Sequence, residues 1–325
     1  MKRRDMIQIS TFGAAACLSP LSFAQSYPKS SVTVILPLQA GSASDVAVRH
    51  MSERLAQKFG VGFVVENIAS AAGVVGLDKV AKAKPDGQTI AALNNSIVTI
   101  LPHLQPQNVK VDTRKDFVPV TGIANIPTFI AVPANSPIKN IKDFLARARS
   151  EGGKMTYSSG GIGSPQHLAT ELLMSMANIK LSHIPYRGAT QAALAVAANE
   201  VEVMSMALPL AQPFLPNNKV RLIAYSGIER HPQFRDVPTV SEQGIKGYEY
   251  SSWIGFFMHK DTPAEIINVL RKESEIIVNL RDFHRQLIRS GLDPWPQNAT
   301  QLGKIVQDDF AKWQRVIKDA KIQSA

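Results

Sequence analysis

The chain has 325 residues, of which 45% are apolar and 19% are charged, and its formal net charge is +10. This length and composition support a sizeable hydrophobic core and favour two domains over one. The basic residues are scattered without a run of five or six like charges, which argues against nucleic-acid binding. No apolar stretch beyond the N-terminus approaches the roughly 18 residues of a membrane-spanning helix.

The first 24 residues have the features of a secretory signal peptide. Basic residues at positions 2–4 precede a short apolar stretch, and residues 22–24 (SFA) resemble a signal peptidase site. Cleavage near Ala24 would place the mature protein in the periplasm, by either the general or the twin-arginine export route. The chain's one cysteine, Cys17, lies in this segment, so the mature protein would lack disulfides, zinc-thiolate sites and thiol catalysis.

From residue 31 the sequence alternates β-branched runs with amphipathic helical patterns, which is typical of an α/β protein with mainly parallel sheets. The predicted strands are 31–38, 62–67, 89–95, 128–134, 154–159, 201–208 and 220–227. The predicted helices are 44–60, 140–153, 165–176, 190–200, 261–280 and 298–321. No low-complexity tract or long linker divides the chain, so two domains would be interleaved rather than sequential.

Several predicted helices carry end signals. Gly60 is expected to stop the first helix. Thr262, followed by Pro263 and Glu265, reads as a capping box at the start of the helix within 261–280.

Two segments, 32–55 and 154–176, share one plan of strand, glycine-serine loop and helix. In the second, Ser164 is a plausible N-cap, and Pro165 then takes the first helical position, where its missing N–H costs nothing. Gly160, Gly161 and Gly163 let the backbone turn its N–H groups toward a ligand, and a helix N-terminus favours an anion. Each segment could lead its own lobe, so that two helix N-termini hold a carboxylate across a cleft that closes by a hinge.

Other chemistry has little support. The loop lacks the third glycine of G-x-G-x-x-G, and neither a phosphate-binding P-loop nor the G-x-S-x-G of a hydrolase occurs. The seven histidines include no H-E-x-x-H, and no paired carboxylates or positioned base can be named, so we expect no metal, no cofactor and no enzymatic activity. His167 lies nearest the loop and either bonds to it or contacts a ligand.

The order of short motifs resembles the Bug (Bordetella uptake gene) family, the substrate-binding receptors of tripartite tricarboxylate transporters. The resemblance covers nearly all of the mature chain and rests on YP (27–28), ILPLQAGSASD (35–45), VVEN (64–67), AKAKPDG (81–87), DFVPVTGIA (116–124), YSSGGIGSPQHLA (157–169), HIPYRG (183–188), RDVPTVSEQG (235–244) and WIGFF (253–257).

The resemblance implies an α/β, two-lobed periplasmic-binding-protein fold of type II, in which each lobe is a sheet flanked by helices. Lobe one would comprise 27–127 and 250–325, and lobe two 128–249. The implied function is extracytoplasmic capture of a small organic carboxylate in the inter-lobe cleft. The implied partners are the ligand and the membrane subunits of a tripartite tricarboxylate transporter, which some members lack; nucleic acid is not one, and the protein is expected to be a monomer.

The resemblance also implies a set of ligand-binding residues, carried over by position. The first loop would contribute Leu38, Ala40, Gly41, Ser42 and Asp45, with Asn95 nearby. The second loop would contribute Ser158, Gly160, Gly163 and Ser164, and the wall would be completed by Tyr186, Gly188 and Ala207. In the family an aromatic residue usually stands at Leu38 and a second glycine at Ser42. Many members have an acidic residue at Met206; without that partner for an ammonium group, we expect a plain carboxylate rather than an amino acid as ligand.

Two other functions use the same architecture. A hydrolase acting in the same two-lobed cleft would need a nucleophile and base that the motifs do not reveal. A transcription-factor effector domain would need a helix-turn-helix at the N-terminus, where this chain has a predicted signal peptide. Fold alone does not separate these possibilities, because function depends on the residues of the site.

Overall fold

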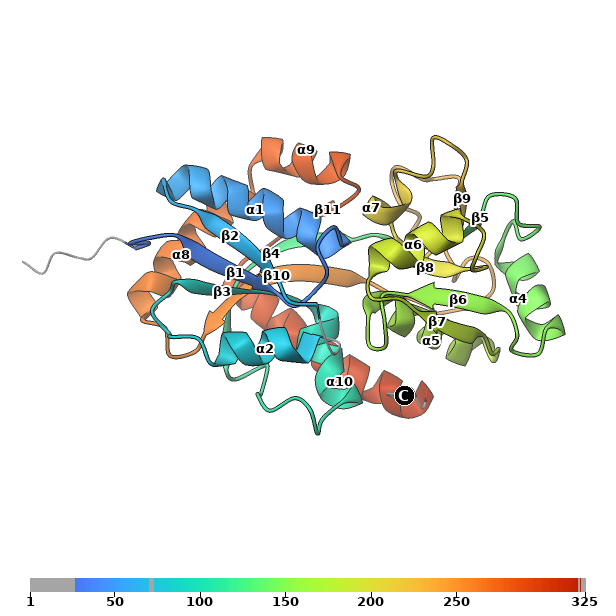
Figure 1. Cartoon of the computed structure of the whole chain (residues 1–325), viewed down its shortest axis with the longest axis horizontal. Coiled ribbons are helices and arrows are strands. Elements are labelled where there is room, and N and C mark those ends of the chain that lie inside the picture. The colour runs from blue at the N-terminus through green and yellow to red at the C-terminus, as the bar shows by residue number, and fades with distance from the viewer. Residues whose placement is uncertain (1–26, 70–72, 321, 323–325) are drawn as a thin grey trace, which may run out of the picture.

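The chain forms two α/β units that lie side by side, as Figure 1 shows for this computed structural model, which describes residues 27–69, 73–320 and 322. The predicted signal peptide, 1–24, lies outside the described residues. None of the described helices combines the length and the apolar character needed to cross a membrane.

The first unit is built on a six-stranded sheet with the strand order β11-β4-β10-β3-β1-β2. Its strands are β1 (Val32–Leu36), β2 (Phe63–Asn67), β3 (Thr89–Asn94), β4 (Phe117–Ile126), β10 (Ser252–His259) and β11 (Asp293–Gln297). One face packs against α1 (Ala43–Phe59), α8 (Ala264–Val278) and α9 (Arg281–Arg289). The other packs against α2 (Val74–Ala81), the π-helix η2 (Ser96–Ile100) and α10 (Ala299–Ala320), with α3 (Leu101–Leu104) directly after η2.

The second unit contains a three-stranded and a two-stranded sheet. The orders are β8-β5-β9, formed by β8 (Met204–Ala207), β5 (Thr128–Pro133) and β9 (Val220–Tyr225), and β6-β7, formed by β6 (Thr156–Ser159) and β7 (Ser182–Pro185). A parallel bridge between Tyr157 and Val203 joins them. Residues of α4 (Ile141–Ser150) and α5 (Pro165–Ala177) pack in one core cluster, and residues of α6 (Ala189–Ala197) and α7 (Leu208–Ala211) in another.

The expectation of mainly parallel sheets is wrong. Within the described strands, the pairs β1–β2, β1–β3 and β6–β7 are parallel, and the pairs β10–β3, β10–β4, β11–β4, β5–β8 and β5–β9 are antiparallel. The reason is the path of the chain: β4 leads out of the first sheet into β5, and β10 returns antiparallel to β4, directly beside it. The predicted strands do not include β4 and β10, whose residues belong to two of the family motifs.

The helix-end predictions had mixed outcomes. Gly60 caps α1 in the left-handed region at φ 69°, and Ser164 caps α5 with Pro165 as its first residue, both as predicted. The capping box at Thr262 is wrong, because α8 starts at Ala264 after Pro263 in the cap position, without a side-chain cap bond. Proline at that position fixes the backbone before the helix and leaves Thr262 one residue too early to cap it.

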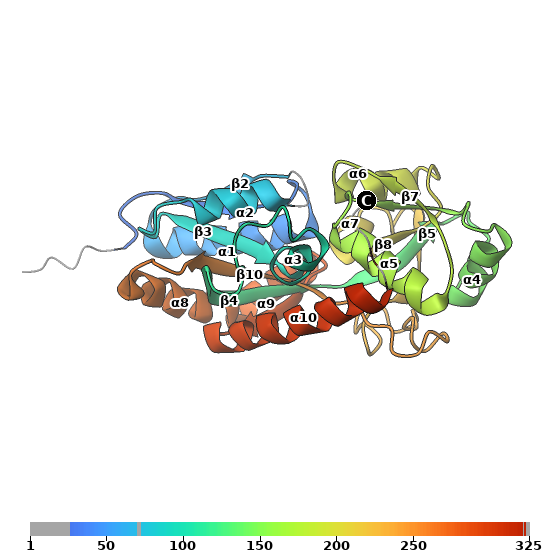
Figure 2. The same cartoon turned by 90° about the horizontal axis from the view of Figure 1, so that it is seen from below.

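The last helix, α10, contacts both units (Figure 2). Leu302 and Val306 belong to a core cluster of the first sheet, whereas Trp313 belongs to the cluster that contains α4 and α5. Between them, Asp309 accepts a hydrogen bond of 2.7 Å from the indole N–H of Trp253 in β10. The helix therefore ties the strand that returns from the second unit to the cores of both.

Candidate functional site

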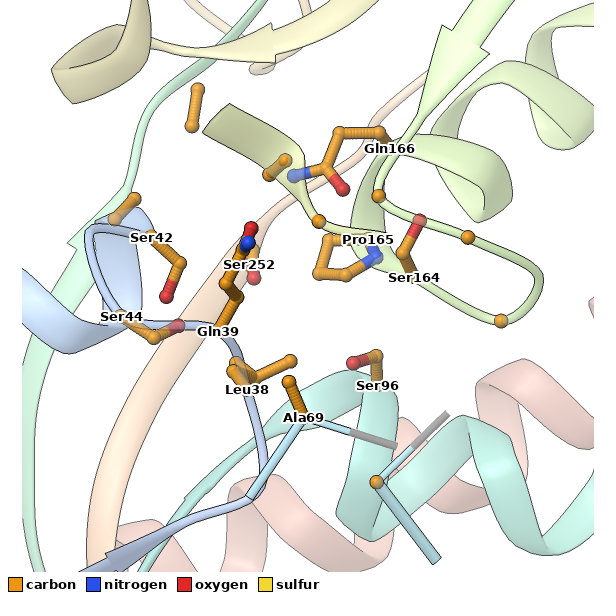
Figure 3. A pocket seen from close by; sticks show the side chains of 18 of the residues that line it. Leu38, Gln39, Ser42, Ser44, Ala69, Ser96, Ser164, Pro165, Gln166 and Ser252 are labelled. Atoms are coloured by element: carbon orange, nitrogen blue, oxygen red, sulfur yellow. The ribbon is translucent and has the colours of Figure 1, made fainter. Parts of the chain in front are cut away.

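A cavity of about 540 Å³ lies between the two units and is lined by residues of both. From the first unit come the loop between β1 and α1 and the start of η2; from the second come the loop between β6 and α5 and the turn between β7 and α6. Figure 3 shows these segments facing one another across the cavity. Its volume is suited to a small molecule.

The N-terminus of α1 is held by reciprocal bonds within its own loop. Gly41 has a φ of 76°, a left-handed conformation that glycine adopts without strain. The Ser42 hydroxyl accepts a hydrogen bond from the N–H of Asp45, and the Asp45 carboxylate in turn accepts one of 2.9 Å from the N–H of Gly41. These bonds fix the loop in the shape that presents the helix start to the cavity.

The N-terminus of α5 has the same geometry, position by position. Gly163 has a φ of 77°, and the Ser164 hydroxyl accepts a hydrogen bond from the N–H of His167. Here the imidazole of His167 replaces the carboxylate, and its Nδ1 accepts the N–H of Gly163 at 3.3 Å. The similarity of segments 32–55 and 154–176 is thus a similarity of local structure around two facing helix starts.

These helix starts direct unpaired N–H groups at the cavity. The first two residues of α1, Ala43 and Ser44, and the second of α5, Gln166, all line it. N–H groups at such positions have no acceptor inside the helix. A third helix, α6, also begins here, with Gly188 as its cap and Ala189 as its first residue. The helix dipoles and free donors together favour an anionic group.

The charge distribution agrees with that preference. Of the described residues that line the cavity, Arg187 alone has a charged side chain, and it is exposed; none is acidic. Asp45 is 3% exposed and does not line the cavity. Its carboxylate is occupied by Gly41 N–H, by Arg49 Nε at 2.8 Å and by Asn67 Nδ2 at 2.9 Å. Its negative charge is therefore neutralised before it can oppose a bound anion.

Two histidines, the buried His167 and the half-buried His183, support the second loop. His183 Nε2 lies 2.7 Å from the hydroxyl of Ser159, which also accepts the N–H of Gly161. The ring centroids of His183 and His167 lie 4.7 Å apart. Burial lowers the pKa of His167 to about 4, and burial together with the neighbouring His167 lowers that of His183 to about 4. Both imidazoles are therefore neutral at pH 7.

Eight of the thirteen residues carried over from the family line the cavity: Leu38, Ser42, Gly160, Gly163, Ser164, Tyr186, Gly188 and Ala207. The other five do not. Ala40 and Gly41 are exposed beside it, and Thr190 donates to the carbonyl of Gly41 at 3.4 Å across the two units. That any of the thirteen contacts a ligand stays a prediction.

The remaining three predicted residues have bonds inside the protein. Asp45 is occupied as described above. The buried Asn95 amide donates to Ser251 O at 2.8 Å and accepts from the hydroxyl of Ser252, which itself lines the cavity. Ser158 is fully buried and donates to Ala192 O at 3.0 Å, which holds α6 against β6. They support the cavity wall from behind.

Motif matching missed several polar residues that line the cavity, namely Gln39, Ser44, Ser96, Gln166, Ser205 and Ser252. For Gln166 a signal was present, since it follows the predicted cap Ser164 by two residues and so occupies the first turn of the helix. For Ser205 and Ser252 no local signal existed, because strand pairing far from each in sequence brings them to the cavity.

Met206 does not line the cavity, contrary to the expectation that it stands at the ligand. This side chain is fully buried in a core cluster, whereas its strand neighbours Ser205 and Ala207 line the cavity. Successive side chains of a strand point to opposite faces, so residue 206 does not face a ligand. The expectation of a plain carboxylate therefore rests on the absence of acidic side chains from the described lining, and not on Met206.

Two serine–histidine pairs occur among the described residues, and neither forms part of the cavity wall. Ser159, paired with His183, is fully buried. Ser290 lies 2.9 Å from His50 Nε2, and the amide of Gln286 lies 2.8 Å from His50 Nδ1. An amide N–H donated to Nδ1 leaves Nε2 as the protonated nitrogen, so His50 cannot take a proton from Ser290.

The sequence profile described as "Tripartite tricarboxylate transporter family receptor" matches residues 47–322. The chain belongs to this family. A UPF0065 protein from Pseudomonas sp. (strain P51) is 31% identical to this receptor over 299 residues, which cover 92% of the receptor and 88% of that protein.

Solved structures resemble the receptor throughout. Rpa4515 of R. palustris with adipate has a TM-score of 0.87 at 27% identity, covering 92% of the receptor and 99% of that chain. The periplasmic binding protein BugD has a TM-score of 0.85 at 26% identity, with 91% and 99% covered. MatC from Rhodopseudomonas palustris with malate has a TM-score of 0.84 at 26% identity, covering 90% of the receptor and 100% of that chain. These similarities confirm the predicted family and the two-lobed periplasmic-binding-protein fold, and they make the receptor a solute-binding protein.

Proposed function

We propose that the receptor captures a small organic carboxylate in the cavity between its two units. The observation that carries this proposal is the pair of matching helix N-termini, α1 and α5, which open onto one cavity whose described lining contains no acidic side chain. Each helix dipole contributes about 0.3–1 kcal/mol to an exposed anion and more to a buried one. Similar proteins are described with adipate and with malate, which are both carboxylates.

The proposal extends to location and partners. After export and cleavage near Ala24, lobe one (27–127 and 250–325) and lobe two (128–249) would close over the ligand in the periplasm by a hinge at the two chain crossings. The liganded monomer would then deliver the carboxylate to the membrane subunits of a tripartite tricarboxylate transporter, as the family description implies. The protein would bind its ligand without chemical turnover.

A thermal-shift screen over mono-, di- and tricarboxylates tests the binding proposal. A ligand present at 100 times its dissociation constant is expected to add about 2.7 kcal/mol to the free energy of unfolding. Phosphate esters, sugars and purines form the comparison set at the same concentration. If one of those classes raised the unfolding temperature and no carboxylate did, the protein's ligand would not be a carboxylate and a different function would be required.

Amino acids are expected to bind more weakly than the matching carboxylates without the amino group. An ammonium group would enter a cavity whose described wall has no acidic partner for it, while three helix N-termini add positive potential. Calorimetry with succinate against aspartate, and with propionate against alanine, should give at least a tenfold preference for the deaminated compound. Tighter binding of the amino acid in either pair would contradict this.

A further inference from the structure

One side chain of the first unit ends against the backbone of the second. Gln39, in the loop between β1 and α1, reaches Gly188, the cap residue of α6. Figure 3 shows this side chain extending out of its loop toward the second unit. A Cβ atom built at Gly188 would overlap Oε1 and Cδ of Gln39 and would lie 2.9 Å from its Nε2. The amide of Gln39 therefore occupies the space that a side chain at position 188 would need.

The backbone of Gly188 does not itself require glycine. Its φ of −179° and ψ of 166° describe an extended conformation that any residue adopts. The residue is buried, and the three heavy atoms nearest to the missing Cβ all belong to Gln39. At this position glycine therefore provides room for a neighbour that approaches the backbone closely.

The start of α6 has little room to yield to a larger residue, because it also packs tightly within its own unit. A Cβ at Gly160, in the loop after β6, would lie 2.8 Å from Ala189 N and 3.2 Å from Gly188 C. The bond from Ser158 to Ala192 O holds the first turn of α6 against β6 as well. A side chain at position 188 would therefore have to displace Gln39 or the first unit.

The enclosure of Gln39 depends on the opposite unit. Its Oε1 is buried without a donor in the described structure, whereas water would hydrate the amide if the two units stood apart. A second contact joins the same two segments two residues further along each, where Thr190 donates to the carbonyl of Gly41 at 3.4 Å. Gln39 and Gly188 both line the cavity, so this seam between the units runs beside the bound ligand.

We infer that Gln39 and Gly188 form a closing pair. When the two units close, the amide of Gln39 enters the space left by the missing side chain at Gly188, and this fit sets the starts of α1 and α6 in position over the ligand. The inference rests on the proposed function, in which the units close by a hinge over a carboxylate. Both members are positioning residues, because they act on the ligand through the helix starts.

A methyl group at position 188 would disturb the closed arrangement in one of two ways. It would hold the units apart, or it would turn the amide of Gln39 into the cavity that Gln39 already lines. The first outcome removes one wall from the ligand, and the second places a side chain in the ligand's space. Both weaken binding, and both depend on the presence of the Gln39 amide.

A double-mutant cycle, measured by calorimetry on the mature protein, tests the closing pair. The probe is the carboxylate that binds the parent protein most tightly, with malate, adipate, succinate and propionate among those titrated. Gly188→Ala should weaken its binding roughly tenfold or more. Gln39→Ala vacates the space of the amide, so adding Gly188→Ala to that variant should cost about threefold or less. The effect of Gln39→Ala itself cancels in this comparison.

Gly303→Ala is the matched control for a glycine-to-alanine change. It lies in α10, and its Cβ would meet Pro119 Cγ at 3.6 Å, an ordinary contact within the first unit. This variant should keep the affinity of the parent protein. Urea unfolding of all the variants checks that each remains folded.

The outcomes separate the closing pair from the proposed function. An equal loss of affinity from Gly188→Ala with and without Gln39 would mean that the methyl group hinders the ligand directly, and parental affinity in Gly188→Ala would mean that the fit is unimportant. Either result overturns the inference and leaves carboxylate capture standing. If only a sugar, purine or phosphate ester binds, the proposed function fails, and the same cycle with that compound decides the inference. No binding of any compound would overturn both.

Discussion

Gly163→Val is expected to weaken ligand binding at least 100-fold while the protein remains folded. At a φ of 77° a β-branched residue is strained by about 1–3 kcal/mol, and the loop can relieve this only by rotating the backbone. That rotation would break the bond from Gly163 N–H to His167 and displace the Ser164 cap, so the start of α5 would no longer face the cavity as it does now. Calorimetry with the best carboxylate of the screen, together with urea unfolding, measures both effects.

Gly60→Val supplies a matched control for backbone strain. Gly60 has a φ of 69°, and a Cβ there would meet nothing within 4 Å. It caps the far end of α1, roughly 25 Å from the cavity along the helix. This variant should lose about as much free energy of unfolding as Gly163→Val and keep its affinity for the carboxylate. Equal losses of stability with normal binding in both variants would mean that the turn at Gly163 is structural only.

Acid pH is expected to destabilise the protein through His167 and His183. Because burial holds both pKa values near 4 in the folded chain, against about 6.5 unfolded, the folded state binds fewer protons between these values. The free energy of unfolding therefore falls as the pH falls from about 6.5 to about 4, and this contribution does not change further below pH 4. The loss is on the order of 3 kcal/mol for His167 and smaller for the half-buried His183.

Urea unfolding between pH 8 and 4, in buffers without carboxylates, measures this dependence. The double variant His167→Gln, His183→Gln has no imidazole to protonate under the loop, so its stability should vary less with pH than that of the parent between pH 6.5 and 4. Above pH 7 the two proteins should show parallel curves, offset by the cost of the substitutions. An unchanged slope in the acid window would show that other groups dominate the acid sensitivity.

Local signals predicted the start of α5 and the end of α1 well. Ser164, Pro165 and Gly60 have roles that depend on their nearest neighbours, which the sequence shows directly. The parallel-sheet prediction failed because β10 lies between β3 and β4, and this arrangement is decided by the return of the chain from the second unit. Hydrophobic patterning records which strands are buried, and it does not record their direction.

The candidate site was predictable where it consists of backbone, and less so where it consists of side chains. The residues carried over by position from the family identified the two loops, because the turn before each helix requires a glycine and a small capping residue. They did not separate Ser42, which lines the cavity, from Asp45, which supports it three residues later. Gln39 and Gln166 lie within two of the family motifs, but only the folded structure shows that both residues line the cavity.

The path of α10 across both units has a practical consequence for measuring ligand binding. The three tryptophans of the chain lie along it or beside it. The ring of Trp253 stacks on that of Trp295 with 5.6 Å between the ring centroids, and the rings of Trp313 and Tyr250 have centroids 5.9 Å apart. Tyr250 and Trp253 flank the point where the chain crosses back into the first unit. Any rotation of one lobe against the other changes the surroundings of these indoles, so intrinsic fluorescence gives an optical signal of closure without an added label.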